Sequence, residues 1–224
     1  MPAVLLPTYQ EAENIAAMVR AVRDVLPQAR ILVIDDASPD GTADRAAEAG
    51  AELLRRTGPR GLGPAYREGM LWALAEGLDP IYQMDADFSH DPADLLRLNT
   101  DADLTLGSRY VPGGGTRNWA LHRQMISRFG SIYASRLLGM AVADPTGGFK
   151  CWRAATLRRL DVASVRSDGY VFQVETTFRA IQMGARLREV PILFTERREG
   201  KSKMSTAIAL EAAVAIPRLR WGRR

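Results

Sequence analysis

The sequence predicts an α/β protein with a mostly parallel central sheet and helices on both of its faces. Short apolar runs alternate with segments of helical periodicity in the first half of the chain, and such alternation is typical of a parallel sheet. The 224 residues are 46% hydrophobic and 25% charged, the ordinary balance of a globular protein. We expect one domain over residues 1–224, because no linker rich in Gly, Pro or Ser divides the chain.

Strands and helices are expected in turn from the N-terminus. A strand at residues 3–6 precedes a helix at residues 11–26, which is predicted from apolar side chains at helical spacing: Ile15, Met18, Val19 and Val22. Further strands are expected at residues 30–34, 51–54, 81–84 and 104–107, and further helices at residues 42–49 and 66–75. Such sheets bind ligands beyond the carboxyl ends of their strands, so the polar residues there are candidates for a functional site.

The second half of the chain has a less regular pattern. Residues 117–140 contain neither proline nor an acidic residue, but Gly130 and Gly139 weaken the prediction of one unbroken helix. The elements expected after it are a helix at residues 171–183, a strand at 187–194, a polar loop at 195–205 and a helix at 206–216. Pro217 is expected to end the last helix and to leave a basic tail.

No segment of the sequence is expected to cross a membrane. No window approaches the roughly 20 apolar residues of a spanning helix, and Pro7 interrupts the N-terminal apolar stretch too early for a secretory signal. The single cysteine, Cys151, forms no disulfide within the chain, which fits a reducing compartment, and is predicted to be buried. We therefore expect a cytoplasmic protein whose contact with a membrane is peripheral.

The net charge of +4 suits an anionic partner. Nucleic acid, acidic lipid and a phosphorylated substrate all meet that description. Because the sequence carries no recognised nucleic-acid-binding motif, we expect no nucleic-acid partner.

Two aspartates, Asp85 and Asp87, follow the expected strand at residues 81–84. Aspartates separated by one residue just past a strand can both face a cation, and their oxygen ligands suit Mg²⁺ or Mn²⁺. A cation held there would bridge the two phosphates of a nucleotide diphosphate and neutralise charge on that leaving group. The alternative is a solvated acidic turn in which Asp91 caps the next helix.

Acidic residues also follow the first two strands, at Glu11 and at Asp35–Asp36. The aspartate pair could hold a base or a ribose hydroxyl, or it could form the acidic pocket of a receiver-type signalling domain. Neither histidine is assigned a chemical role: His90 is interpreted as a turn residue and His122 as part of a basic face.

The sequence resembles family 2 glycosyltransferases of the GT-A fold, most closely the dolichyl- and polyprenyl-phosphate mannosyltransferases. Each matching segment is a weak signal alone, but together they follow the order of the family and span nearly the whole chain. The segments are LPTYQE (6–11), IDDASPDGT (34–42), DADFSHDP (85–92), GSRY (107–110), DPTGGF (144–149), GYVFQVE (169–175) and RREGKSK (197–203).

The resemblance implies a role for individual residues. Asp85 and Asp87 would bind the metal ion, with the Ala86 backbone beside the diphosphate, and Arg109 would contact the acceptor phosphate. Ser89 stands where some members carry a glutamine that also binds the metal. The nucleotide pocket would comprise Pro7, Tyr9, Glu11, Ile34 and Asp36, and the mobile loop at residues 195–205 would close over the donor with Arg197 and Lys203.

The implied reaction is inverting transfer of mannose from GDP-mannose to a polyprenyl (dolichyl-type) monophosphate. The second pKa of that phosphate is about 6, so the acceptor is mostly ionised near neutral pH and needs no strong general base. Catalysis would depend on Asp87 through the metal, and on Arg109 and Arg123, because a guanidinium can bind phosphate through two hydrogen bonds. The alternatives are another donor such as UDP-glucose, or a non-enzymatic receiver-like module.

Residues 117–140 are the candidate membrane-interface and acceptor helix. Arginines alternate there with Trp119, Phe129 and other apolar residues, and a basic amphipathic helix of this kind can lie in an anionic bilayer surface. Alternatively, the apolar stripe packs into the core. The resemblance is to members without a spanning helix, so we expect docking on the membrane surface, either directly or through a membrane-anchoring partner protein. The basic tail around Trp221 is a second candidate.

Overall fold

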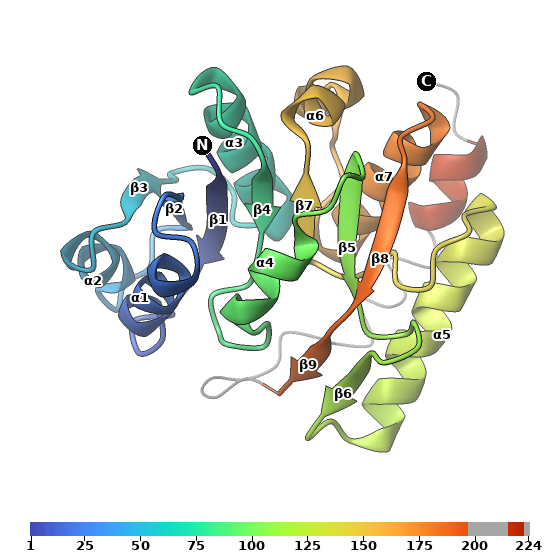
Figure 1. Ribbon diagram of the computed structural model, residues 1–224, viewed down its shortest axis with the longest axis horizontal. Coiled ribbons are helices and arrows are strands. Elements are labelled where there is room, and N and C mark those ends of the chain that lie inside the picture. The colour runs from blue at the N-terminus through green and yellow to red at the C-terminus, as the bar shows by residue number, and fades with distance from the viewer. Residues whose placement is uncertain (197–214, 222–224) are drawn as a thin grey trace.

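The computed structural model describes residues 1–196 and 215–221, and its centre is a seven-stranded sheet (Figure 1). The strands are β1 (Ala3–Thr8), β2 (Arg30–Asp35), β3 (Glu52–Arg55), β4 (Ile81–Gln83), β5 (Leu104–Ser108), β7 (Lys150–Trp152) and β8 (Leu187–Pro191). Their order is β3-β2-β1-β4-β7-β5-β8. Only β7 is antiparallel to its neighbours β4 and β5, so the predicted mostly parallel sheet is confirmed.

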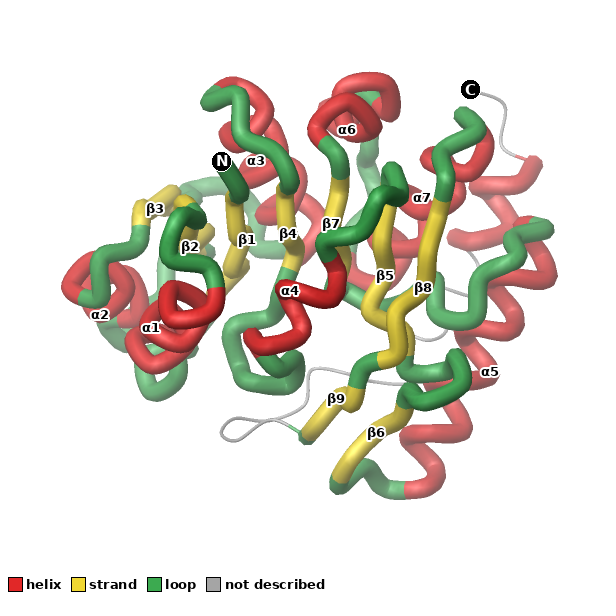
Figure 2. The backbone as a smooth tube through the Cα atoms, viewed as in Figure 1, coloured by secondary structure: helices red, strands yellow, loops and turns green. Residues whose placement is uncertain are grey.

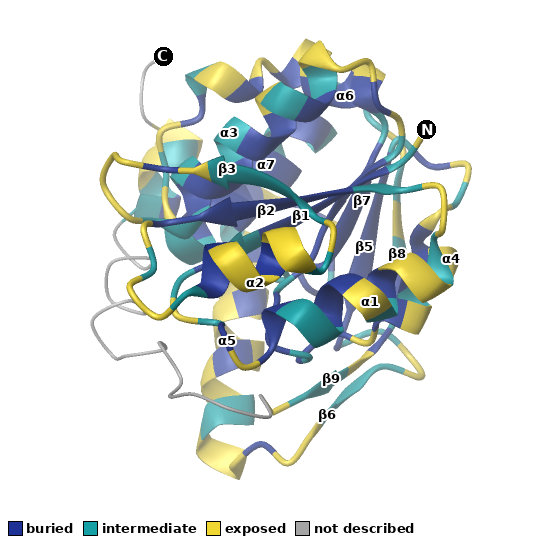
Figure 3. Ribbon diagram, turned by 90° about the vertical axis from the view of Figure 1, so that its left-hand side faces the viewer, coloured by how far each residue is buried: buried dark blue, intermediate teal, exposed yellow. Residues whose placement is uncertain are grey.

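Helices cover both faces of the sheet, as predicted (Figure 3). One face carries α1 (Ile15–Val25), α2 (Thr42–Glu48) and α4 (Leu95–Leu98), the last preceded by a 3₁₀ turn at Pro92–Asp94. The other carries α3 (Leu62–Ala75), α5 (Leu121–Leu138), α6 (Ala154–Leu160) and α7 (Gly169–Gln182). Alternation along the strands builds both cores: in β1, Ala3 and Leu5 face α3, whereas Val4 and Leu6 face α1.

Helix α1 begins later than the sequence pattern predicts. Ile15, Met18, Val19 and Val22 are fully buried, as expected, but residues 11–14 form a turn. The carbonyl of Glu11 accepts hydrogen bonds from the N–H groups of Asn14, at 3.0 Å, and Ile15, at 2.9 Å. The Glu11 side chain is therefore on the loop between β1 and α1.

The strand predicted at residues 187–194 is two strands in the structure. Strand β8 belongs to the central sheet, whereas β9 (Leu193–Thr195) pairs in parallel with β6 (Gly115–Arg117) in a small separate sheet below it (Figure 2). Between them, the Ile192 N–H donates to the Ser108 carbonyl at 3.0 Å, and the Ile192 carbonyl accepts from the Gly115 N–H at 3.0 Å. This change of partner carries β9 away from the central sheet.

Helix α5 runs unbroken through Gly130 and ends at Gly139, whose φ of 67° is a common helix C-terminal conformation. Leu138 packs inward, but most large apolar residues of the stripe do not, so the alternative of an inward-packed stripe is wrong for them. Small residues face the protein instead, among them Ser131 and Ala134, while Leu121 and Phe129 are 76% and 66% exposed. No helix of the described residues is long and apolar enough to span a bilayer.

The C-terminal predictions are described only in part. Residues 197–214, which include most of the expected loop and helix, lie outside the described residues. Residues 215–221 are helical, so Pro217 does not end the helix there. Ile216 is buried in the core beside α5, and Trp221 is exposed.

Candidate active site

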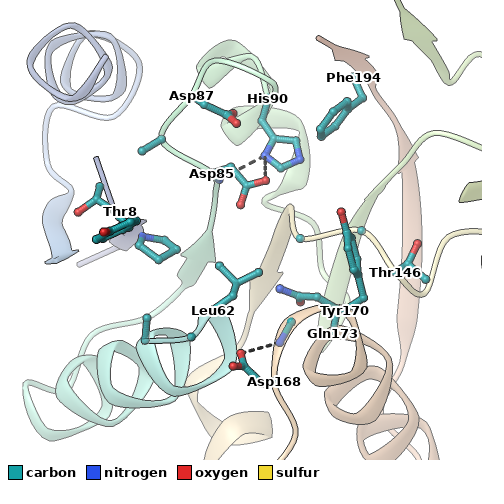
Figure 4. A pocket seen from close by; sticks show the side chains of 18 of the residues that line it. Thr8, Leu62, Asp85, Asp87, His90, Thr146, Asp168, Tyr170, Gln173 and Phe194 are labelled. Atoms are coloured by element: carbon teal, nitrogen blue, oxygen red, sulfur yellow. Dashed lines mark hydrogen bonds and ion pairs between the residues drawn. The ribbon is translucent and has the colours of Figure 1, made fainter. Parts of the chain in front are cut away.

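A cavity of about 580 Å³ lies at the carboxyl ends of β1, β2, β4 and β5 (Figure 4). The position follows from the topology, because parallel strands bring their carboxyl ends to one edge of the sheet. The structure brings most predicted site residues to its wall: Pro7, Tyr9, Glu11, Asp36, Asp85, Ala86, Asp87, Arg109 and Arg123.

Three predicted residues are not part of this wall as described. The Ile34 side chain is fully buried in the core, where its Cδ1 lies 2.6 Å from the position that a Cβ on Gly69 would occupy. The alternation of β2 turns it toward α3, so the expected contact of Ile34 with the nucleotide is wrong for its side chain. Arg197 and Lys203 lie outside the described residues.

The two aspartates after β2 have separate roles. Asp35 is buried and holds neighbouring loops, because its carboxylate accepts hydrogen bonds from the Thr8 hydroxyl at 2.9 Å and the Ser38 N–H at 2.9 Å. Asp36 faces the cavity, where it forms a buried ion pair with Arg56 and accepts from the Gly61 N–H at 3.0 Å. Asp36 is therefore fixed at one end of the cavity.

Arg60 contributes to the same end and was not predicted. Its guanidinium lies 4.1 Å from the centre of the Tyr9 ring, and both residues line the cavity. Arg60 belongs to a loop without a distinctive motif, so only the tertiary structure reveals this stacked pair.

Asp85 and Asp87 both line the cavity after β4. The Asp87 carboxylate is buried and accepts from the Ser89 N–H at 3.0 Å, while Asp85 accepts from the Tyr66 hydroxyl at 3.4 Å. Across the described part of the chain, no group of three or more His, Cys, Asp or Glu residues is arranged to hold a metal ion. A Mg²⁺ or Mn²⁺ ion at this pair would take its other ligands from phosphates and water, as Mg²⁺ commonly does.

His90 is part of the site, although the sequence pattern indicates only a turn residue there. The ring is 2% exposed and stacks on Phe149 at 4.8 Å, with Phe194 edge-on at 5.0 Å. Its Nδ1 accepts from the Asp85 N–H at 3.3 Å, so the neutral ring carries its proton on Nε2. Burial lowers the pKa of His90, although the neighbouring Asp85 carboxylate acts to raise it. The lowered pKa keeps the ring neutral near pH 7.

Arg109 is buried at the opposite end of the cavity from Asp36 and paired with Asp144. Its Nε and Nη2 each donate to one Asp144 oxygen at 2.7 Å, and Nη2 also donates to the Thr146 hydroxyl at 3.0 Å. Burial alone would lower the pKa of Arg109, but the Asp144 charge raises it overall, so the guanidinium stays charged.

Arg123, from the first turn of α5, reaches the same end of the cavity. Its guanidinium lies 4.0 Å from the Trp119 ring centre and pairs with Glu196 at 3.1 Å. The Nε of Arg123 and the indole Nε1 of Trp119 are both buried, and neither has a hydrogen-bond partner among the described residues. Two adjacent N–H donors in this state provide a place for an anion.

Comparison with known proteins agrees with this geometry. The sequence model of glycosyl transferase family 2 matches residues 3–162. An undecaprenyl-phosphate mannosyltransferase from Micrococcus luteus is 46% identical over 226 residues, which cover 97% of this chain and 92% of the relative. A polyprenol monophosphomannose synthase from Mycolicibacterium smegmatis is 44% identical over 231 residues, covering 99% and 86%.

The solved structures that resemble this chain identify its fold. Glucosyl-3-phosphoglycerate synthase from Mycobacterium tuberculosis, in complex with Mn²⁺, UDP and phosphoglyceric acid, matches with a TM-score of 0.76 and 16% identity, covering 100% of this chain and 79% of that one. At this identity the likeness establishes the GT-A fold alone. The family model covers most of the chain, and two relatives are 44–46% identical over nearly all of it. The chain therefore belongs to glycosyl transferase family 2 and is a glycosyltransferase.

Proposed function

We propose that the protein transfers mannose from GDP-mannose to a polyprenyl monophosphate, with inversion at the anomeric carbon and with the help of Mg²⁺ or Mn²⁺. One observation carries the proposal: a single cavity has a carboxylate pair suited to a metal diphosphate on one side and two arginines suited to a phosphate on the other. The names of the two bacterial relatives support a lipid-phosphate acceptor and mannose as the sugar. Membership of the family excludes the receiver-like module.

The donor would bind at the Asp36 end. Pro7, Tyr9, Glu11 and Asp36 line that end of the cavity, and the Arg60–Tyr9 stack gives it a flat, positively charged wall. Asp36 is neutralised and held in place by Arg56, so its carboxylate is positioned before a ligand arrives. A base or ribose hydroxyl fits these groups, but they do not separate guanosine from uridine donors.

The DxD pair fits a divalent ion. Asp85 and Asp87 would hold it, with hard oxygen ligands and with coordination positions left for phosphate oxygens. The bound ion would supply neutralisation of the charge that develops on the departing diphosphate. The neutral His90 ring, packed against Phe149 and hydrogen-bonded to the Asp85 backbone, would keep that loop in position.

The acceptor phosphate would bind at the arginine end. Asp144 and Thr146 engage Nε and Nη2 of Arg109, so we expect Nη1 to meet the phosphate. The Nε–H of Arg123 and the indole N–H of Trp119 would add two further donors. An acceptor held in this way is already ionised near neutral pH and can attack the anomeric carbon without a base.

A transfer assay with Asp87→Asn tests the proposal. Purified protein would be mixed with Mg²⁺ or Mn²⁺, a polyprenyl phosphate and either radiolabelled GDP-mannose or UDP-glucose. We expect transfer from GDP-mannose by the wild-type enzyme and a loss of at least about 100-fold in the variant, the scale on which electrostatic groups act in catalysis. Asp91→Asn is the matched control, because Asp91 is exposed and only caps the turn at Pro92–Asp94.

Two outcomes would refute parts of the proposal. Full activity of Asp87→Asn would remove the metal role of this pair. Transfer from UDP-glucose alone would replace the donor while keeping the reaction class.

We also propose that α5 docks on the cytoplasmic face of an anionic membrane. Its outward face carries large apolar residues: Leu121, Met125, Ile126, Phe129, Ile132 and Tyr133. Arg128 and Arg136 flank this stripe, which is the composition of an interfacial helix. Because Arg123 lies on the same helix and reaches the cavity, docking would bring the lipid phosphate close to the site.

Liposome flotation tests the docking. Wild-type protein should float with vesicles that contain phosphatidylglycerol, and Phe129→Glu should lose most of that binding. Leu96→Glu is the matched control, because Leu96 is an apolar residue of similar exposure, 60%, on α4. If the wild-type protein does not bind the vesicles even at low salt, direct docking is wrong. A membrane-anchoring partner protein then becomes the explanation to test.

A further inference from the structure

Gln173 is a buried residue of α7 whose side chain has no bonding role within the described protein. It is 1% exposed and lines the cavity, and neither its Nε2 nor its Oε1 has a hydrogen-bond partner among the described residues. A buried amide in this state is unusual, because the desolvated donor and acceptor are costly to leave unpaired. Its retention in a cavity wall therefore points to a ligand that completes its bonds.

The backbone around Gln173 is held firmly. Its carbonyl accepts hydrogen bonds from the Lys150 ammonium at 2.7 Å and from the Thr177 hydroxyl at 2.9 Å. Both of these partners are fully buried. The amide is thus carried by a rigid segment, which is what a recognition group requires.

The amide lies close to the aspartate pair. A methyl group on Gly148 would stand 3.6 Å from Gln173 Nε2 and 3.7 Å from Asp85 Oδ1, so the two side chains flank the same small space. Figure 4 shows Gln173 reaching toward the cavity from α7, with Asp85 on the loop across from it. In a nucleotide sugar, the hexose is attached directly to the diphosphate, so a diphosphate at Asp85 would place the hexose beside this space.

We propose that the Gln173 amide binds hydroxyl groups of the transferred hexose and is a specificity-determining residue of the donor site. This inference rests on the proposed function, which puts the diphosphate at Asp85 and Asp87. The chemistry of the amide matches a sugar, because it offers donors and an acceptor without charge, and a hydroxyl group can engage either.

The test compares binding of the nucleotide sugar with binding of the nucleoside diphosphate that lacks the sugar. Calorimetry with Mn²⁺ and without acceptor would give both dissociation constants for the wild-type protein and for Gln173→Leu, using whichever donor the wild-type enzyme transfers. We expect the variant to bind the nucleotide sugar roughly 10- to 100-fold more weakly and to bind the nucleoside diphosphate as before. Its melting temperature should hold or rise, because leucine removes the unpaired amide.

Gln83→Leu is the matched control. Gln83 is a second fully buried glutamine with an unpaired Nε2, but its Oε1 accepts from the Trp152 indole at 2.6 Å, and it does not line the cavity. We expect this variant to melt at a lower temperature, because Trp152 loses its partner, while its preference for the nucleotide sugar is unchanged. Gly148→Ala adds a test of position: its methyl group should weaken binding of the nucleotide sugar and spare the nucleoside diphosphate.

Deoxy-sugar donors separate hydroxyl recognition from general packing. One deoxy analogue should bind the wild-type protein more weakly than the full donor, yet bind Gln173→Leu as well as the full donor does. Equal weakening of nucleotide sugar and nucleoside diphosphate by Gln173→Leu would overturn the inference, as would no effect on either. Donor identity is judged separately from the wild-type transfer assay, so failure of the GDP-mannose proposal would appear there and not in this comparison.

Discussion

Replacing Asp144 with asparagine should destabilise the protein strongly, because it breaks a buried ion pair at the arginine end of the cavity. The Asp144 side chain is fully buried and that of Arg109 is 7% exposed. Besides the two bonds from the guanidinium, the Asp144 carboxylate accepts from the Arg109 backbone N–H at 3.0 Å and from the Thr146 hydroxyl at 3.2 Å. The Asp144→Asn amide would present an NH₂ group to a guanidinium that has only donors.

The expected loss follows from that geometry. Removing one partner of a buried pair leaves an uncompensated charge, which costs about 3–5 kcal/mol. Against a total stability of roughly 5–15 kcal/mol for a typical protein, this is a large fraction. Burial alone would raise the pKa of Asp144, but Arg109 lowers it overall below the usual value of 3.8. The contribution is therefore complete above about pH 4 and is lost as the pH falls through the lowered pKa of the folded state.

Urea unfolding at pH 7 and at pH 3 would measure the effect. At pH 7 we expect the midpoint of Asp144→Asn to fall by roughly 1 M or more, given typical slopes of about 1–3 kcal/mol per molar urea. Asp101→Asn is the control: Asp101 pairs with Arg186 on the surface, where the two side chains are 84% and 65% exposed, and such pairs contribute at most about 1 kcal/mol. Equal midpoints for wild type and Asp144→Asn at pH 7 would refute the reasoning.

Three further predictions concern Lys150, Gly114 and Cys151. Burial lowers the pKa of Lys150 to about 7, so between about pH 7 and 10.5 the unfolded chain binds a proton that the folded protein lacks. The free energy of unfolding should therefore rise across that window by at most about 1.4 kcal/mol per pH unit. Lys150→Met should abolish the rise between urea titrations at pH 7 and at pH 9. Gly114→Ala should cost roughly 1–3 kcal/mol in thermal unfolding, because its methyl group would lie 2.5 Å from the Ser108 carbonyl oxygen, whereas Gly115→Ala meets nothing closer than Leu193 at 3.7 Å and should be mild. Burial raises the pKa of Cys151 to about 12, so its reaction with a thiol reagent should proceed only as fast as the protein unfolds, and rapid labelling of the native protein would contradict this.

The first half of the fold could be predicted because most of its strands are short, mainly apolar runs followed by polar residues. The same pattern placed Asp36, Asp85 and Asp87 at one edge of the sheet, where the cavity lies. Strand β7 escaped prediction because it is three residues long and contains Lys150, a charged residue that only its tertiary partners make tolerable in the core. Its antiparallel course likewise has no local signal.

The other half of the cavity wall could not be predicted for a related reason. Trp119, Phe194 and Gln173 come from three separate segments of the chain. The tertiary structure brings them together, because β9 diverges from the central sheet and α7 packs behind that sheet. Ile34 shows the converse limit. Its side chain lies within β2 and packs into the core toward α3, whereas Asp36 follows the end of that strand and reaches the cavity.

Helix α5 shows how one segment can serve two surfaces at once. Its inward face is made mostly of small residues, and two of its serines belong to the hydrogen-bond network of the arginine end. The Ser127 hydroxyl pairs with Tyr110 at 2.7 Å, and the Ser131 hydroxyl with Thr146 at 3.0 Å. The outward face is large and apolar, and residues such as Leu121 and Phe129 add nothing to the buried core. In the isolated chain this apolar surface stays exposed to water, so burying it against another surface would be favourable. Asp144 and Thr146, which hold Arg109, contact α5 through Ser131 on its inward face. Covering the outward face would therefore change the surroundings of the helix without requiring the arginine end to rearrange.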